Sequence, residues 1–120
     1  MTLQECYAAL GGDCAEVLSR LRSEALVQKF LLKFPADPSY DLLETSLAAG
    51  NWEEAFRGAH TIKGVCQNLD FTRLYRSSCQ LSEALRNGFT PEAPALAEQV
   101  KADYAQTVSA IRAFQESAGV

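Results

Sequence analysis

The feature that most constrains the fold is the spacing of apolar residues in the middle of the chain. Between residues 51 and 69 they recur at alternating intervals of three and four, which places them on one side of an α-helix. The ranges 71–88 and 92–117 repeat this rhythm, and none of the three ranges alternates with the period of two that a β-strand shows. We therefore predict three long amphipathic helices that pack against one another.

Shorter helices are predicted before these three. The ranges 2–10, 13–21 and 39–49 have helical periodicity and are bounded by glycine, proline or polar residues. Another helix is expected between Ser23, which suits an N-cap, and Pro35, which lacks an amide hydrogen. Short connections between long helices make neighbours antiparallel. The predicted fold is all-α: an antiparallel up-down four-helix bundle with additional short N-terminal helices.

Length and charge limit the classes of protein that fit. With 120 residues the chain has room for one domain, in which we expect 1–22 to be a helical extension and 23–117 to be the bundle. The net charge of -4 argues against a nucleic-acid partner, which would favour a basic surface. No run approaches the roughly 18 apolar residues that a membrane span requires. A monomer that does not bind membranes is expected.

The cysteines indicate the compartment. Four cysteines occur without a C-x-x-C spacing, and a single histidine accompanies them, so no metal site is predicted. The N-terminus lacks the basic and apolar regions of a signal peptide. We expect buried free thiols and a cytoplasmic location.

The single histidine lies on the predicted helix 51–69 but outside its apolar side. His60 is rotated by roughly 130° from the centre of that side, so its imidazole is expected to face solvent. Lys63 and Gly64 follow at the spacings that bring helical residues next to each other. Further residues expected on the same exposed side are Phe56, Arg57 and Gln67.

This combination suits a group that accepts a phosphoryl group. In-line attack requires a neutral imidazole that protrudes into cleared space, and an exposed histidine is mostly neutral at pH 7. Glycine inside a helix costs roughly 1 kcal/mol relative to alanine, so Gly64 calls for a steric reason. The ammonium group of Lys63 can lie beside phosphoryl oxygens. Periodicity alone leaves open that His60 and Lys63 are ordinary solvent-exposed side chains and that Gly64 marks close packing of helices.

The residues around His60 resemble the signature of histidine-containing phosphotransfer (Hpt) domains. The matching run is AHTIKG at 59–64, and the resemblance is strongest over residues 26–88. Within that range the chain also has a leucine-rich element ending in phenylalanine, a G-N-W turn, an N-L-x-F turn and a closing L-R-x-G. Two departures are Val65-Cys66-Gln67, where many members have very small residues, and Asp70, where glycine is common.

The resemblance implies a function for the central residues. It implies that a receiver domain's aspartyl phosphate phosphorylates Nε2 of His60, which passes the group to another receiver. Lys63 would assist the phosphoryl oxygens, and Gly64 would leave room for the receiver. The chain would thus be a phosphocarrier in a two-component phosphorelay, with receiver domains of response regulators or a hybrid histidine kinase as partners and without a cofactor. The sequence has no glycine-rich nucleotide loop, so we expect no ATP site and no independent enzyme activity.

Other residues are expected to support this reaction. Phe56, Arg57 and Gln67 would contact the partner. Some members of the family hold the other ring nitrogen or the phosphate with a side chain of the next helix, and Gln80 or Ser82 lies across from His60 in the expected hairpin.

Two alternatives remain open from the sequence. The chain could be the P1-like phosphoacceptor domain of a chemotaxis-type histidine kinase, which an ATP-binding domain phosphorylates. It could also be a bundle that is never phosphorylated and that binds a protein helix through Phe56 and Leu42.

Overall fold

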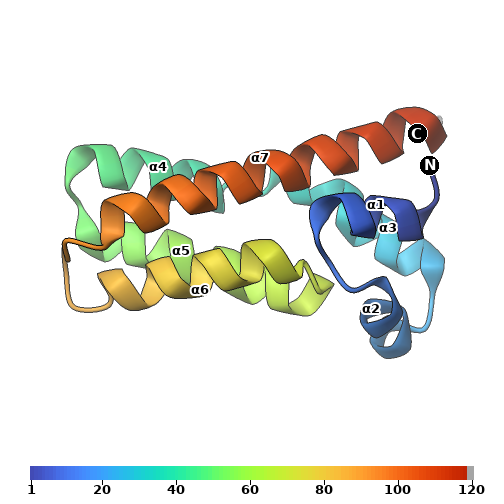
Figure 1. Cartoon of the computed structure of the whole chain (residues 1–120), viewed down its shortest axis with the longest axis horizontal. Helices are drawn as coiled ribbons and strands as arrows, with labels where there is room; N and C mark the ends of the chain where they lie inside the picture. Colours follow the sequence, from blue (N-terminus) through green and yellow to red (C-terminus); the bar gives the residue numbers. More distant parts are fainter. Residues whose placement is uncertain (119–120) are drawn as a thin grey trace.

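Seven α-helices and one 3₁₀ turn make up most of the part of the chain that the structure describes, residues 1–118 (Figure 1). This computed structural model has no strand within those residues, and the all-α prediction is confirmed. The elements are α1 (Leu3–Leu10), α2 (Cys14–Leu21), α3 (Glu24–Lys33), the 3₁₀ turn η1 (Phe34–Ala36), α4 (Ser39–Ala49), α5 (Trp52–Leu69), α6 (Thr72–Leu85) and α7 (Ala93–Ala118).

Polar residues begin several of these helices by capping the first turn. The side chains of Asp13, Ser23 and Asn51 each accept a hydrogen bond from the backbone N–H three residues later, which the helix itself cannot pair. Gly50 and Asp70 end α4 and α5 in the left-handed conformation, with φ of 70° and 56°. These caps and stops explain why α4, α5 and α6 follow one another through very short connections.

Helix α6 is shorter than predicted. We expected a helix over 71–88, but α6 ends at Leu85. The backbone N–H of Arg86 donates to the carbonyl oxygen of Glu83, three residues back, at 3.3 Å. The helical hydrogen-bond pattern therefore tightens and stops before Gly88, whose φ of 107° is one that glycine adopts readily.

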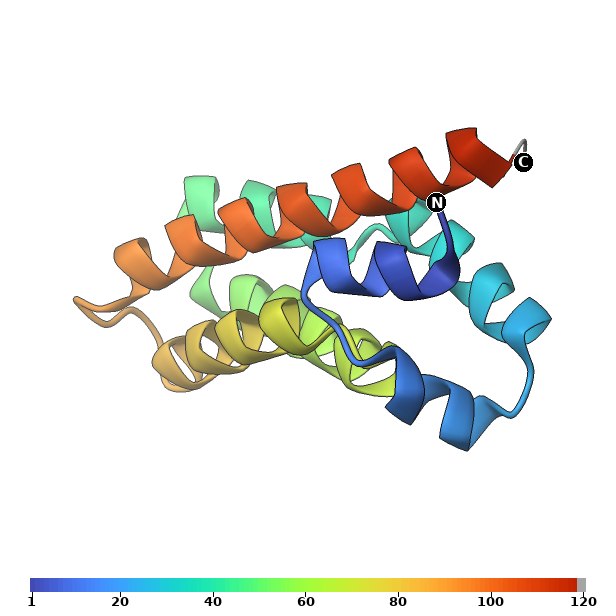
Figure 2. The ribbon, with the colours of Figure 1, turned by 45° about the vertical axis from the view of Figure 1, so that its right-hand side comes forward.

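Helices α4 to α7 form the antiparallel bundle. Helix α5 packs against α4 on one side and α6 on the other, and α7 packs against α6. The turn η1 separates α3 from α4 at Pro35, because proline cannot donate a backbone hydrogen bond. Figures 1 and 2 show α1 beside the part of α7 that lies farthest from the α6/α7 loop.

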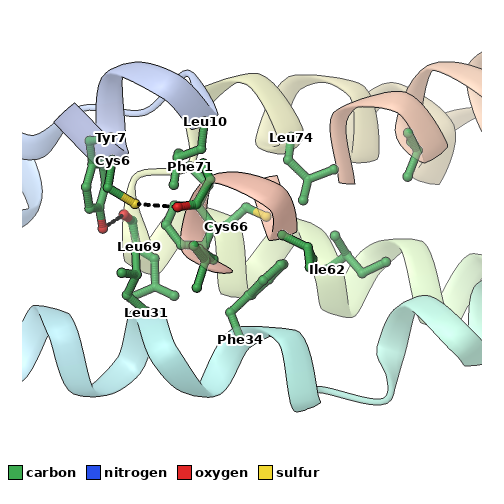
Figure 3. Close-up of a cluster of buried hydrophobic side chains, with 14 of the residues drawn as sticks. Cys6, Tyr7, Leu10, Leu31, Phe34, Ile62, Cys66, Leu69, Phe71 and Leu74 are labelled. Carbon is green, nitrogen blue, oxygen red and sulfur yellow. Dashed lines mark hydrogen bonds between the residues drawn. The ribbon is translucent and has the colours of Figure 1, made fainter. Parts of the chain in front are cut away.

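Helix α1 contributes to the same core as the bundle (Figure 3). The hydroxyl of Tyr7 donates to the backbone oxygen of Leu69 at 2.7 Å, at the end of α5, and burial raises the pKa of this tyrosine. The ring centroids of Phe71 and Tyr7 are 5.7 Å apart. The ring of Phe71 also meets that of Phe34 edge-on, with centroids 5.1 Å apart. The N-terminal helix is thus fixed to the α5/α6 turn. The buried residues of α1 are Leu3, Cys6, Tyr7 and Leu10.

The cysteines divide into two pairs. Cys6 and Cys66 are fully buried, and burial raises the pKa of Cys6 to about 11 and raises that of Cys66 as well. Cys14 and Cys79 are only partly buried. The expectation of buried free thiols is therefore confirmed for two of the four cysteines and wrong for the other two.

Two glycines of α5 have opposite surroundings. A Cβ at Gly58 would lie 3.0 Å from the backbone nitrogen of Leu43, so α4 and α5 approach closely at this point. A Cβ at Gly64 would meet nothing within 4 Å. Packing therefore accounts for Gly58 but not for Gly64.

This contrast predicts opposite effects of the same substitution. We expect Gly64→Ala to raise the free energy of unfolding by about 0.5–1 kcal/mol, because alanine favours the helix and meets no obstacle. Gly58→Ala should lower it by about 1 kcal/mol or more, because the backbone of Leu43 cannot move aside easily. Urea denaturation of both variants measures the difference, and equal changes would contradict the packing argument.

Candidate functional site

His60 lies near the middle of α5 and projects away from the bundle. Its neighbours Ala59 and Ile62 are 0% and 2% exposed, whereas His60 is an exposed residue. Because each helical residue turns by about 100°, the buried side of α5 leaves position 60 on the outer surface. The predicted exposure of the imidazole is confirmed.

The aromatic ring of Phe56 supports one side of the imidazole. Phe56 is partly buried and lies one turn before His60 on α5. The two rings stack with centroids 5.6 Å apart and an angle of 21° between their planes. The imidazole therefore has one apolar neighbour on the side that faces the start of α5.

The other side of His60 is open. Gly64 lies one turn further along α5, and the space that a side chain there would begin to fill contains no atom within 4 Å. The predicted clearance is confirmed. A bulky group can therefore approach the imidazole over bare backbone.

Charged side chains surround this surface. Lys63 is partly buried on α5, and its charge contributes to lowering the pKa of Glu83 on α6, although the hydrogen bond from Arg86 contributes most. Arg57 is exposed and pairs with Glu54 one turn earlier, with 3.5 Å between Nη1 and Oε1. The exposed side of α5 thus carries both cations predicted for it.

Gln67 lies on the same surface, two turns beyond His60. Its side chain is exposed, while its backbone oxygen accepts a hydrogen bond of 3.2 Å from Arg20 of α2. The same guanidinium group donates to the backbone oxygen of Asn68 at 2.7 Å and to the side chain of Asp70. Helix α2 therefore holds the end of the helix that carries the site.

Among the described residues, neither Gln80 nor Ser82 forms a hydrogen bond with the imidazole. Gln80 is exposed and lines a shallow depression together with Gln99 and Asp103 of α7. Ser82 is 1% exposed, and its hydroxyl is buried without a hydrogen-bond partner. An exposed imidazole and a buried hydroxyl do not share a surface.

Two residues of α6 and the following turn belong to this surface although the sequence did not single them out. The guanidinium carbon of Arg86 lies over the ring of Phe56, 5.4 Å from its centroid, and Arg86 also pairs with Glu83. The hairpin register that puts residue 80 across from His60 puts residues near 84 across from Phe56, but it does not give the rotation of α6 that brings Arg86 to that ring.

The described residues include neither a group of metal ligands nor a membrane-spanning helix. Within residues 1–118, no three His, Cys, Asp or Glu side chains are grouped so that they could hold a metal ion. None of the helices described here has the length and apolar character needed to cross a membrane.

A comparison with protein-family models identifies the family of this chain. The model for the Hpt domain matches residues 12–110, from the turn before α2 into α7, and this range contains all of α5 and α6. The chain belongs to the Hpt domain family. Comparison with curated proteins and with solved structures gave no match.

Membership of the family gives the general function. Hpt domains are phosphocarriers in two-component signalling, where they interact with receiver domains and kinases. This Hpt domain has one histidine in its entire sequence. That histidine is the exposed residue beside Gly64.

The buried hydroxyl of Ser82 generates a prediction about stability. We expect Ser82→Ala to leave the free energy of unfolding unchanged or to raise it, because an unpaired buried hydroxyl costs about 1–3 kcal/mol. Ser78→Ala is the matched control, since the Ser78 hydroxyl donates to the backbone oxygen of Leu74 at 2.7 Å. Thermal denaturation compares them, and a larger loss in Ser82→Ala than in Ser78→Ala would mean that the Ser82 hydroxyl has a partner.

Proposed function

We propose that His60 is the phosphoacceptor of this Hpt domain. It takes a phosphoryl group from the phospho-aspartate of a receiver domain and passes it to the aspartate of another receiver. The observation that carries this proposal is the open space over Gly64 beside an exposed imidazole. A glycine that lowers helix stability without a packing role is explained by the approach of a partner.

The chemical step is a displacement at phosphorus. The lone pair of Nε2 of His60 forms the N–P bond while the bond between phosphorus and the aspartyl oxygen breaks. The aspartate of the receiver leaves as a carboxylate, and the proton on Nδ1 of His60 remains there. The reverse step on a second receiver returns the imidazole to its neutral form.

The neighbouring side chains have proposed roles in this step. The ammonium group of Lys63 lies one turn from His60 and neutralises charge on the phosphoryl oxygens. Gly64 admits the rim of the receiver's active site. Phe56, Arg57 and Gln67 contact the receiver around the imidazole. We leave Gln80 and Ser82 out of this set, because one faces α7 and the other is buried.

We further propose that residues 1–120 form one domain, which works in the cytoplasm as a monomer. A carrier that serves two receivers in turn must release each of them, so a small and transient interface suits it. The sequence has no glycine-rich loop for a nucleotide, and we expect ATP alone to leave the domain unlabelled.

Labelling with a phosphorylated receiver tests the assignment. We expect radioactive phosphate to pass to the wild-type domain in a form that is labile to acid and stable to alkali, as a phosphoramidate is. His60→Gln should receive none, because no other histidine exists. Label that survives acid, or that persists in His60→Gln, would refute the proposal. Labelling only by an ATP-loaded kinase domain would instead favour a P1-like domain.

The clearance over Gly64 makes a second prediction. Gly64→Gln should slow transfer from a phospho-receiver by about tenfold or more, because the added side chain occupies the approach and displaces the reacting groups. Phosphorylation of the same variant by phosphoramidate, a small donor without a docking surface, should be unchanged. Circular dichroism checks that the helices are retained. Equal transfer rates for wild type and Gly64→Gln with the receiver would remove the clearance argument.

A further inference from the structure

A continuous series of contacts leads from α6 to the imidazole of His60. The guanidinium of Arg86 pairs with Glu83, with 3.2 Å between Nε and Oε1. The same guanidinium lies over the ring of Phe56, 5.4 Å from its centroid, and that ring stacks on His60. The order of contacts is therefore Glu83, Arg86, Phe56 and His60.

Each contact restricts the next side chain. Glu83 of α6 precedes Arg86, the first residue after that helix, by three positions, so the ion pair restrains the position of the guanidinium. A cation is attracted to the face of an aromatic ring, which favours one position of the Phe56 ring. The outermost torsion of a histidine is broadly distributed, and stacking on a fixed neighbour narrows it. The plane of the His60 ring therefore depends on side chains of α6.

The charges in this series persist at neutral pH. The hydrogen bond from Arg86 lowers the pKa of Glu83, and the same pair raises the pKa of Arg86. Both side chains are about half exposed, at 48% for Arg86 and 60% for Glu83, so the pair contributes little to folding. The ion pair of Glu83 and Arg86 therefore needs an explanation other than folding stability, and its link to His60 through the ring of Phe56 offers one.

We propose that Arg86 is a positioning residue for phosphoryl transfer, acting on His60 through the ring of Phe56. This inference rests on the proposed function of His60. The guanidinium does not touch the phosphoryl group; it holds the ring against which the imidazole stacks, so that Nε2 points toward the docked receiver. Loss of this support lowers the fraction of docked complexes that are oriented for attack.

Kinetics with a phospho-receiver separate positioning from docking. We expect Arg86→Gln and Phe56→Leu to lower the transfer rate at saturating receiver by about tenfold, because a misplaced nucleophile reacts slowly even when bound. In Arg86→Gln, the receiver concentration at half-saturation should stay unchanged. Arg76→Gln is the matched control, because Arg76 is an exposed arginine of α6 that lines the depression facing α7.

Nuclear magnetic resonance of the unphosphorylated domain gives a readout that does not depend on transfer. The three-bond couplings between the Hβ protons and the ring carbon Cδ2 of His60 report its outermost torsion. They should indicate a narrow distribution in wild type, Phe56→Tyr and Arg76→Gln, and a broad one in Arg86→Gln and Phe56→Leu. Unchanged couplings and unchanged rates in Arg86→Gln would overturn the inference. A rise in the half-saturation concentration alone would also overturn it, by making Arg86 a docking contact.

These outcomes distinguish the two proposals. If wild-type domain receives no acid-labile label, the proposed function of His60 fails, while the couplings still show whether Arg86 orders the ring. If wild type is labelled but Arg86→Gln matches it in rate and couplings, the inference about Arg86 fails and the phosphoacceptor assignment stands.

Discussion

The packing of α5 between α4 and α6 determines where every group of the site lies. Small residues on the buried side, including Ala55, Gly58 and Ala59, allow the neighbouring helices to approach closely. With that side fixed, the periodicity of the helix leaves His60 on the outer surface. The direction in which His60 projects is therefore set by the buried residues of α5.

The two central glycines of α5 show how one residue type meets two demands on a single helix. Gly58 lets two backbones come together, whereas Gly64 keeps a patch of backbone bare. The first lowers helix propensity in exchange for packing within the bundle. The helix propensity that Gly64 costs is not offset by any packing contact within residues 1–118, and for this reason we relate Gly64 to the approach of a partner.

Much of the architecture could be predicted because it rests on local signals. The caps Asp13, Ser23 and Asn51 and the stop at Gly50 act within one or two turns, so the sequence reveals them directly. The exposure of His60 followed from periodicity in the same way. The end of α6 was wrong by three residues, because a switch to a tighter hydrogen bond at Arg86 leaves no composition signal.

The groups that sequence reasoning missed depend on contacts between helices. The pairing of Arg86 with Phe56 and the burial of the Ser82 hydroxyl require the rotation of α6 about its axis, which a hairpin register alone does not give. The bond from Tyr7 to the end of α5 joins residues 62 positions apart. Phe30 of α3 is 40% exposed beside a depression of about 420 Å³ between α2, α3 and α5.

The place of α1 beside the far half of α7 has a consequence for how the domain can be joined to other chains. Figures 1 and 2 show α1 beginning close to the same end of the molecule at which α7 finishes. The α6/α7 loop occupies the opposite end. His60 lies at the middle of α5, away from both ends of that helix. A fluorescent protein or affinity tag fused at either terminus would therefore emerge from one pole of the bundle and leave the imidazole accessible.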